Sequence, residues 1–333
     1  MLLALLLYLG VECWMRWKRL TPTPQDRLAL AAVALFATLL HLAMDALNSY
    51  GVHPFWPVEN RWYYGDSVFI VEPLYWAAAA PLFFVVRSTA ARIVVALAPV
   101  AAIVVGAASH VVLPAWCVGF AILTVIMLIV GARTSARTAA LTSAAFMVFV
   151  TGMFIVAGQA AGRSIDALAN TDFPQDRLID RILTPMPLNP VCWDVLLLET
   201  HGDRYAIRHG TFSNAAGLIR AQGCPTMAAG SGTTAPLVRV LAPDSGTIHW
   251  LGEFAMSRSV LASLVAAHCD AAQIMQFARA PFATEQLSRW VIGDFRFDRG
   301  PRLGMAKFVL DPPSAGPCRR SVPWTPPRQD LLD

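Results

Sequence analysis

The chain has 333 residues, of which 56% are hydrophobic and only 14% are charged, and its formal net charge is +4. Soluble domains average about 25% charged residues, so this composition excludes an ordinary soluble protein and indicates a large membrane part. The sequence contains no basic stretch with interleaved aromatic residues, which argues against a nucleic-acid partner.

The charged residues are concentrated in the second half of the chain. Of the 26 Lys and Arg residues 17 follow residue 162, and so do 16 of the 22 Asp and Glu residues. We therefore predict a multi-pass α-helical membrane bundle followed by a soluble α+β domain with an antiparallel sheet. The expected division is a bundle of about six spans at 1–162, a connector at 163–190, the α+β domain at 191–310 and a Pro-rich, poorly ordered tail at 311–333.

The apolar runs locate the predicted spans. The first run, 1–15, is shorter than the roughly 20 residues that a span needs. It has no basic start and no Ala-x-Ala site, which argues against a cleaved signal peptide. The further predicted spans are 27–48, 67–86, 91–113, 115–131 and 138–161.

Basic residues recur at alternate ends of these spans and predict the topology. The clusters are Arg16, Lys18, Arg19 and Arg27, then Arg87 and Arg92, then Arg133 and Arg137. The positive-inside rule makes these ends cytoplasmic, which predicts an extracytoplasmic C-terminal domain, in a periplasm if the source is Gram-negative. Outside the cytoplasm, Cys192, Cys224, Cys269 and Cys318 could form up to two disulfides.

One predicted span carries a polar face. Thr38, His41, Asp45 and Asn48 are spaced by three, four and three residues, which places them on one side of a helix. An Asp inside a span costs about 2.5–3.5 kcal/mol and usually faces a bundle interior or a watery cavity. A His and an Asp four residues apart could share a metal ion, or they could form a buried hydrogen bond that pins two helices together.

The segment that follows carries a family resemblance. His41-x-x-x-Asp45, Asn48-Ser49-Tyr50-Gly51, Phe55-Trp56-Pro57 and Asp66-x-x-Phe69-Ile70-x-Glu72-Pro73 resemble the YdjM-like family of bacterial membrane-bound metal-dependent hydrolases. The resemblance covers residues 27 to about 90 closely and the later part of the chain loosely. It implies that His41 and Asp45 are metal ligands, and that Asp66 is the loop aspartate. Glu72 stands where the family usually has Asp.

The resemblance implies a metal-dependent hydrolase of the bacterial inner membrane, and the predicted topology puts its site at the outer membrane face. A divalent ion such as zinc would be held by His41 and Asp45, with Asp66 or Glu72 as base or further ligand and Asn48 orienting a ligand. An ester or phosphoester of a lipid-like molecule is the expected substrate, and the lipid bilayer is the expected partner. The alternative is a non-catalytic or degenerate membrane protein, with a structural His–Asp pair and an outer domain that binds a protein partner.

The chain also departs from the family pattern. The family carries an Asp-rich motif and a His-Arg-x-x-Thr-His motif before the matching segment, and neither occurs here. Together with the short first run, this absence leads us to expect that the start at Met1 lies too far downstream and that a helix pair precedes it.

In the soluble half, two strands at 191–200 and 205–212 flank a hairpin turn at His201-Gly202-Asp203-Arg204. The further expected elements are a helix at 213–222, strands near 237–241 and at 247–254, a helix at 258–268, and closing strands at 289–297 and 307–310. We expect His201 and His209 at the surface and His110 near the outer end of its span. The aromatic residues Trp56, Trp62, Tyr63 and Tyr64 are expected to anchor the loop at the membrane interface.

Overall fold

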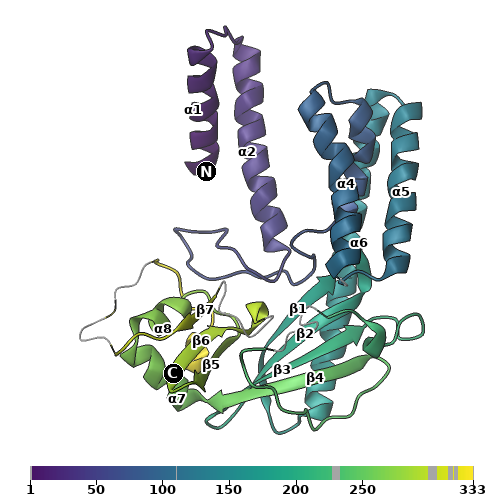
Figure 1. Ribbon diagram of the computed structural model, residues 1–333. Coiled ribbons are helices and arrows are strands. Elements are labelled where there is room, and N and C mark those ends of the chain that lie inside the picture. Colours follow the sequence, from purple (N-terminus) through teal and green to yellow (C-terminus); the bar gives the residue numbers. More distant parts are fainter. Residues whose placement is uncertain are drawn as a thin grey trace.

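The computed structural model describes residues 2–109, 111–226, 233–298, 306–313, 318 and 322–332. Long apolar helices form one half of the molecule and two antiparallel sheets form the other (Figure 1). The predicted fold class, a helical membrane part followed by an α+β domain, is confirmed.

The first two helices form a hairpin, α1 (Leu2–Trp17) and α2 (Pro24–Ala46). Thr23 begins α2 with a capping box, in which its hydroxyl accepts from Asp26 N and the Asp26 carboxylate accepts from Thr23 N. Glu12 of α1 lies 3.2 Å from Arg27 of α2 and braces the pair. The turn between the helices lies at the end far from the sheets (Figure 1).

The second helical group is a bundle of α4 (Thr89–Ser109), α5 (Pro114–Arg133) and α6 (Ala136–Asp172). These three helices surround a short broken helix that consists of α3 (Leu74–Ala79) and η1 (Ala80–Phe84). Among the described helices, α2, α4, α5 and α6 are long and apolar enough to cross a membrane. The predicted span at 67–86 is wrong in its first part, because residues 67–73 are irregular.

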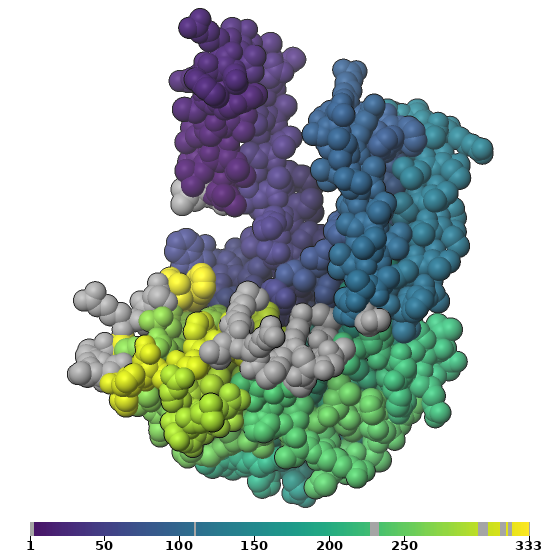
Figure 2. All heavy atoms as spheres, viewed as in Figure 1, coloured from purple at the N-terminus to yellow at the C-terminus, as the bar shows by residue number. Residues whose placement is uncertain are grey.

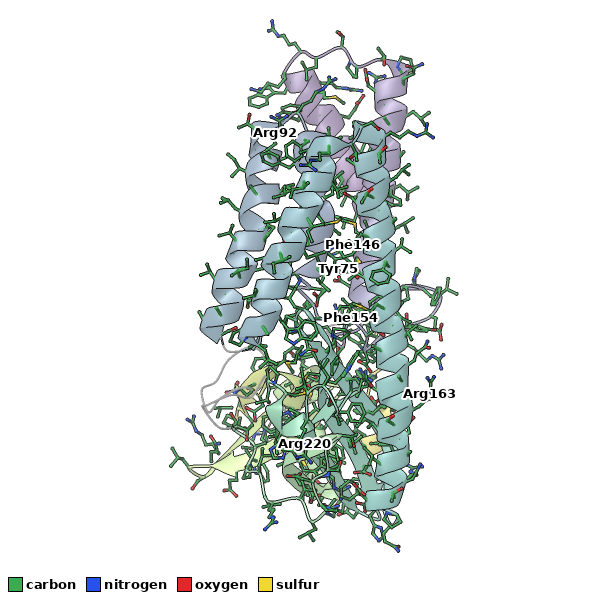
Figure 3. All side chains as sticks on the ribbon, turned by 90° about the vertical axis from the view of Figure 1, so that its right-hand side faces the viewer. Tyr75, Arg92, Phe146, Phe154, Arg163 and Arg220 are labelled. Carbon is green, nitrogen blue, oxygen red and sulfur yellow. A yellow bond between two sulfur atoms is a disulfide. The ribbon has the colours of Figure 1, made fainter. Side chains whose placement is uncertain are left out.

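The bundle interior is packed closely enough to require small residues. A Cβ at Gly131 of α5 would lie 2.6 Å from Pro81 Cα, so only glycine permits this approach of α5 to η1. Tyr75, Phe146 and Phe154 point into the space between the helices (Figure 3), and the Tyr75 hydroxyl lies 2.9 Å from that of Thr151. The broken helix is thus held by α5 and α6.

The α1–α2 hairpin stands apart from this bundle over most of its length. Figure 2 shows a hollow between the two helical groups on the face that it presents. Large apolar side chains are exposed on both groups, including Phe36 (67%) on α2 and Val104 (61%) on α4, as expected of surfaces that face lipid.

Helix α6 joins the two halves of the protein. It has 37 residues and continues past the membrane part to lie along the first sheet (Figure 1). Residues 163–190 are therefore not a connector: they contain the end of α6 and a whole strand, β1 (Arg177–Met186). The composition of the sequence does not reveal that the helix continues, because α6 changes from an apolar to a mixed composition along its length.

The first sheet has the order β1-β2-β3-β4, with β2 (Asn189–His201), β3 (Arg204–Ser213) and β4 (Ile248–Ser257) all antiparallel to their neighbours. The hairpin at His201–Arg204 is as predicted. One face of the sheet buries Trp193, Val195 and Phe212 against α6. The other face packs on the second sheet, so the domain has three layers.

The second sheet consists of β5 (Pro281–Gln286), β6 (Arg289–Asp294) and β7 (Lys307–Val309), flanked by α7 (Arg258–Ala267) and α8 (Cys269–Ile274). Three expectations differ from the structure. Residues 213–222 form turns that lead into a short helix, η2 (Ala221–Gly223), and the strand expected near 237–241 is a single bridge from Val238 to Glu253. The expected strand at 289–297 ends in a helical turn, η3 (Phe295–Phe297).

All four cysteines of the domain are paired, Cys192 with Cys224 and Cys269 with Cys318. The expectation of a poorly ordered tail is wrong for the parts of the tail that the structure describes. Trp324 stacks on His53 with ring centroids 4.3 Å apart, Thr325 N donates to Asn60 O, and Leu331 of η4 (Gln329–Leu331) is buried. The proline content of the tail predicts disorder, but local composition carries no information on these long-range contacts.

Candidate functional site

The His41–Asp45 pair lies near the domain end of α2. The two side chains come from the same helix, with His41 Nε2 3.3 Å from the nearest Asp45 oxygen, and they are 76% and 43% exposed. Thr38, one turn earlier, donates to Ala34 O within the helix. Among the described residues, neither side chain forms a hydrogen bond or ion pair with a second helix, so the interpretation as a pin between two helices has no polar contact to support it.

Asn48 ends α2 and begins the loop that crosses to the domain. Its side-chain oxygen accepts from Tyr50 N at 2.7 Å, and its carbonyl accepts from the backbone of Gly65 and Asp66. These bonds close the loop at 48–66 into a compact unit beneath α2. The side chain of the buried Asn48 is thus engaged in this turn.

Asp66 is bound by the soluble domain. Its carboxylate accepts two hydrogen bonds from Arg279, at 2.7 and 2.8 Å, and Arg279 also donates to Asp180 of β1. Burial alone would lower the pKa of the Arg279 guanidinium, but the carboxylates of Asp66 and Asp180 raise it overall. The guanidinium also lies over the Tyr64 ring, 4.0 Å from its centroid, so it stays charged and fixed.

Glu72 makes a second contact between the two halves. Its buried carboxylate accepts from Leu188 N, in the turn between β1 and β2, and from Leu74 N at the start of α3. Burial raises the pKa of Glu72 to about 8, while the two backbone N–H groups act in the opposite direction. The carboxyl group therefore joins the start of the broken helix to the first sheet.

The backbone of the same segment is held by further side chains of the domain. Arg296 donates to the carbonyl oxygens of Ser49 (2.7 Å) and Tyr50 (3.1 Å), and is itself paired with the buried Asp294. Trp62 donates from its indole N–H to Gln276 O. The segment expected to form a metal centre is thus, for most of its length, the junction between the membrane part and the domain.

A cavity of about 380 Å³ lies within this junction, at the foot of α2. Its charged lining residues are Asp66, Asp180, Arg181 and Arg279, and α6 contributes Gly158 and Gln159. Arg181 donates to Asp166 and lies against the α6 backbone, where a Cβ at Gly162 would come 2.8 Å from its Nη2. Because Arg181 is 39% exposed, the cavity reaches the surface.

The loop aromatic residues divide between the interior and the surface. Trp62 and Tyr64 pack inside the junction, against Trp324 and Arg279 respectively, so they are not interface anchors. Tyr63 donates to Glu59. Trp56 is 55% exposed, and its role as an interface anchor stays a prediction.

A second His–Asp pair, His209 with Asp194, lies inside the domain. The prediction that His209 lies at the surface is therefore wrong. His209 is buried and donates from Nε2 to Asp194 at 2.9 Å, beside a hollow of about 30 Å³ that Ser49 also lines. Such a hollow has room for about one or two waters. His201 lies at the surface as expected, whereas His110 lies outside the described residues.

Sequence reasoning missed the domain side of this junction: Arg279, Asp180, Arg296 and Asp294. A signal was present for Arg279, because a lone charge within the apolar run Phe277-Ala-Arg-Ala-Pro-Phe-Ala283 is a candidate for burial with a partner. The sequence gives no indication that this partner is Asp66.

The described residues do not fit a resident metal ion by themselves. No group of three or more His, Cys, Asp or Glu side chains among them is placed to hold one. His41 and Asp45 offer two donors, whereas zinc sites use about three or four protein ligands. Asp66 and Glu72 are engaged elsewhere, so metal binding at this pair stays a prediction.

The comparison with protein families found one match. Residues 1–113 match the sequence model of the YdjM inner membrane protein family, which confirms the resemblance over the hairpin, the junction segment and α4. Neither a search of curated proteins nor a search of solved structures gave a match. The N-terminal third of the chain is thus similar to the YdjM inner membrane proteins, and this match together with the long apolar helices supports a location in the inner membrane, in contact with its lipid bilayer.

Proposed function

We propose that this YdjM-like inner membrane protein is a hydrolase of the outer membrane face, with His41 and Asp45 as its reacting pair. The observation that carries the proposal is the position of these side chains, 3.3 Å apart and both exposed to the surroundings of the helix. An ionisable pair on a span is expensive unless it meets water or a polar partner, and such residues are typical of functional sites.

The pair has the chemistry of a general base. The Asp45 carboxylate can orient the imidazole, while the other ring nitrogen accepts the proton of an attacking water. The water oxygen then bonds to the carbonyl carbon or phosphorus of the substrate, and the same proton passes to the departing oxygen. An ester or phosphoester of a lipid-like molecule suits a pair at the end of a membrane helix.

Two observations support an extracytoplasmic position for the pair and the domain. The basic residues of the α1–α2 turn lie at the end of the helices far from the domain, as Arg92 does in the bundle (Figures 1 and 3). The domain also carries two disulfides, which form and persist in oxidising compartments. By the positive-inside rule, the basic ends are cytoplasmic.

The test is a mutational cycle on the purified full chain. The activity is measured as hydrolysis of 4-nitrophenyl butyrate or bis-4-nitrophenyl phosphate. We expect His41→Ala, Asp45→Ala and the double variant to lose similar shares of this activity, because the effects of substitutions within one catalytic unit are not additive. Thr38→Ala is the matched control on the same face, and its activity should be unchanged.

Metal content, measured by elemental analysis of the same four proteins, tests the expected divalent ion. Loss of zinc in both single variants would support a shared metal. If the wild-type chain hydrolyses neither probe and binds no metal, the hydrolase proposal fails, and the alternative of a non-catalytic protein with a partner-binding outer domain takes its place.

A further inference from the structure

We propose that the junction cavity binds the headgroup of a zwitterionic phospholipid that carries a primary ammonium group, as phosphatidylethanolamine does. This inference goes beyond the proposed hydrolysis, because it requires no turnover and concerns a different set of residues. The volume of the junction cavity, about 380 Å³, falls within the range of about 300–1,000 Å³ that is typical of small-molecule sites.

The charges of the lining favour a ligand with both signs. Asp66 and Asp180 contribute two negative charges, and Arg181 and Arg279 contribute two positive ones. A purely anionic ligand would meet the two carboxylates, and a purely cationic ligand would meet the guanidinium groups. A zwitterion satisfies both, because each charged end faces a group of opposite sign.

Arg181 is the residue that can bind the phosphate. Arg279 is 5% exposed and is already engaged by Asp66 and Asp180. Arg181 makes its described hydrogen bonds to Asp166 through Nη1 alone, and its side chain lines the cavity. Gln159 of α6 is exposed and can add an amide donor.

The carboxylates of Asp66 and Asp180 can receive the ammonium group. Each carboxylate oxygen can accept more than one hydrogen bond, and an ammonium group has three N–H donors to offer. A choline headgroup has the same charges but no N–H donor. The lining therefore predicts a preference for ethanolamine over choline headgroups.

The cavity also lies at the depth where headgroups are found. The lining residues Gly158 and Gln159 follow the apolar run of α6, and the first charged residues after it, Arg163 and Asp166, lie one to two turns further on. Figure 3 shows Arg163 where α6 enters the level of the sheets. A lipid whose chains lie along the helices would thus bring its headgroup to the cavity.

Native mass spectrometry of the full chain, released from nanodiscs with equal amounts of phosphatidylethanolamine and phosphatidylcholine, tests the proposal. We expect the wild-type protein to retain the ethanolamine lipid about tenfold over the choline lipid, a ratio that one charge-assisted hydrogen bond can supply. Arg181→Gln should abolish this preference, and Arg181→Lys should restore part of it. Arg177→Gln, an exposed arginine of the same strand outside the cavity, should keep it.

Two outcomes would overturn the inference: equal retention of both lipids by the wild-type protein, or the same preference in Arg181→Gln and Arg177→Gln at equal thermal stability. Titration with soluble glycerophosphoethanolamine identifies the source of the headgroup. If this molecule binds as tightly as the lipid, the cavity recognises the headgroup alone and a soluble ligand can supply it. If it binds much more weakly, the headgroup comes from a lipid of the bilayer. Because no step depends on His41, the result is independent of the hydrolase test.

Discussion

The guanidinium group of Arg279 binds the carboxylate of Asp66 through two hydrogen bonds, of 2.7 and 2.8 Å, across 213 residues of sequence. Asp66 belongs to the loop that follows α2, and Arg279 lies just before β5 in the soluble domain. The pair is buried and is completed by Asp180 of β1. It therefore fixes the domain to the membrane part at a defined position.

Removal of the guanidinium group should loosen this junction. Arg279→Met leaves the carboxylate of Asp66 buried without its arginine partner, which typically destabilises a protein by about 3–5 kcal/mol. We expect a large fall in the midpoint of thermal unfolding, followed by tryptophan fluorescence in detergent. The control is Arg61→Ala at the exposed Arg61–Glu59 pair, where solvent screens the charges and little stability should be lost. Equal effects of the two changes would contradict the role of the junction.

Glu72 should make the stability depend on pH. Its pKa is about 8 in the folded protein against 4.5 for an ordinary Glu. Because the folded state binds the proton more tightly, this group contributes most stability below its unfolded pKa, and that contribution is lost as the pH rises through the folded pKa. The window therefore runs from about 4.5 to about 8. Glu72→Gln should flatten the stability profile over this window.

The control for this prediction is Glu285→Gln, an exposed position on β5. Burial also raises the pKa of Glu199, to about 7, so a slope remains in every variant. The measured quantity is therefore the difference between the Glu72→Gln and Glu285→Gln profiles. If these two profiles coincide from acid to alkaline pH, Glu72 is not the buried acid that the junction requires.

Gly131 should tolerate no larger residue. A Cβ there would lie 2.6 Å from Pro81 Cα and 2.7 Å from Pro81 O, and neither backbone atom can move without shifting η1. We expect Gly131→Ala to destabilise the bundle by about 1–3 kcal/mol, the usual range for overpacking. Gly119→Ala on the same helix meets no atom within 4 Å and should be neutral or gain up to about 1 kcal/mol. Thermal unfolding of both variants decides between these outcomes.

The proposed topology predicts where reporter enzymes are active. Alkaline phosphatase needs disulfides, so a fusion after Asp333 should be active and a fusion in the α1–α2 turn after Lys18 should be inactive. A fluorescent protein that matures only in the cytoplasm should give the opposite pattern. Mass spectrometry under non-reducing conditions should find Cys192 linked to Cys224 and Cys269 linked to Cys318. The reverse reporter pattern would place the domain, and the His41–Asp45 pair, on the cytoplasmic side.

The sequence by itself determined the class of the protein and the positions of most helices. Long apolar runs with few charges predict α2, α4, α5 and the first part of α6, because in lipid a helix satisfies its own backbone hydrogen bonds. The i, i+4 spacing placed His41 beside Asp45, since the geometry of one helix depends on no other part of the chain. These features are local, and local sequence is sufficient to predict them.

Only the tertiary structure decided what Asp66 and Glu72 do. Both were expected beside His41 and Asp45, yet Asp66 binds Arg279 and Glu72 binds the backbone of Leu188. A buried carboxylate needs a charged or hydrogen-bonding partner, but its sequence neighbours do not reveal which part of the chain supplies that partner. The partners come from strands and loops more than a hundred residues away, so the role of each carboxylate depends on how the domain docks onto the membrane helices.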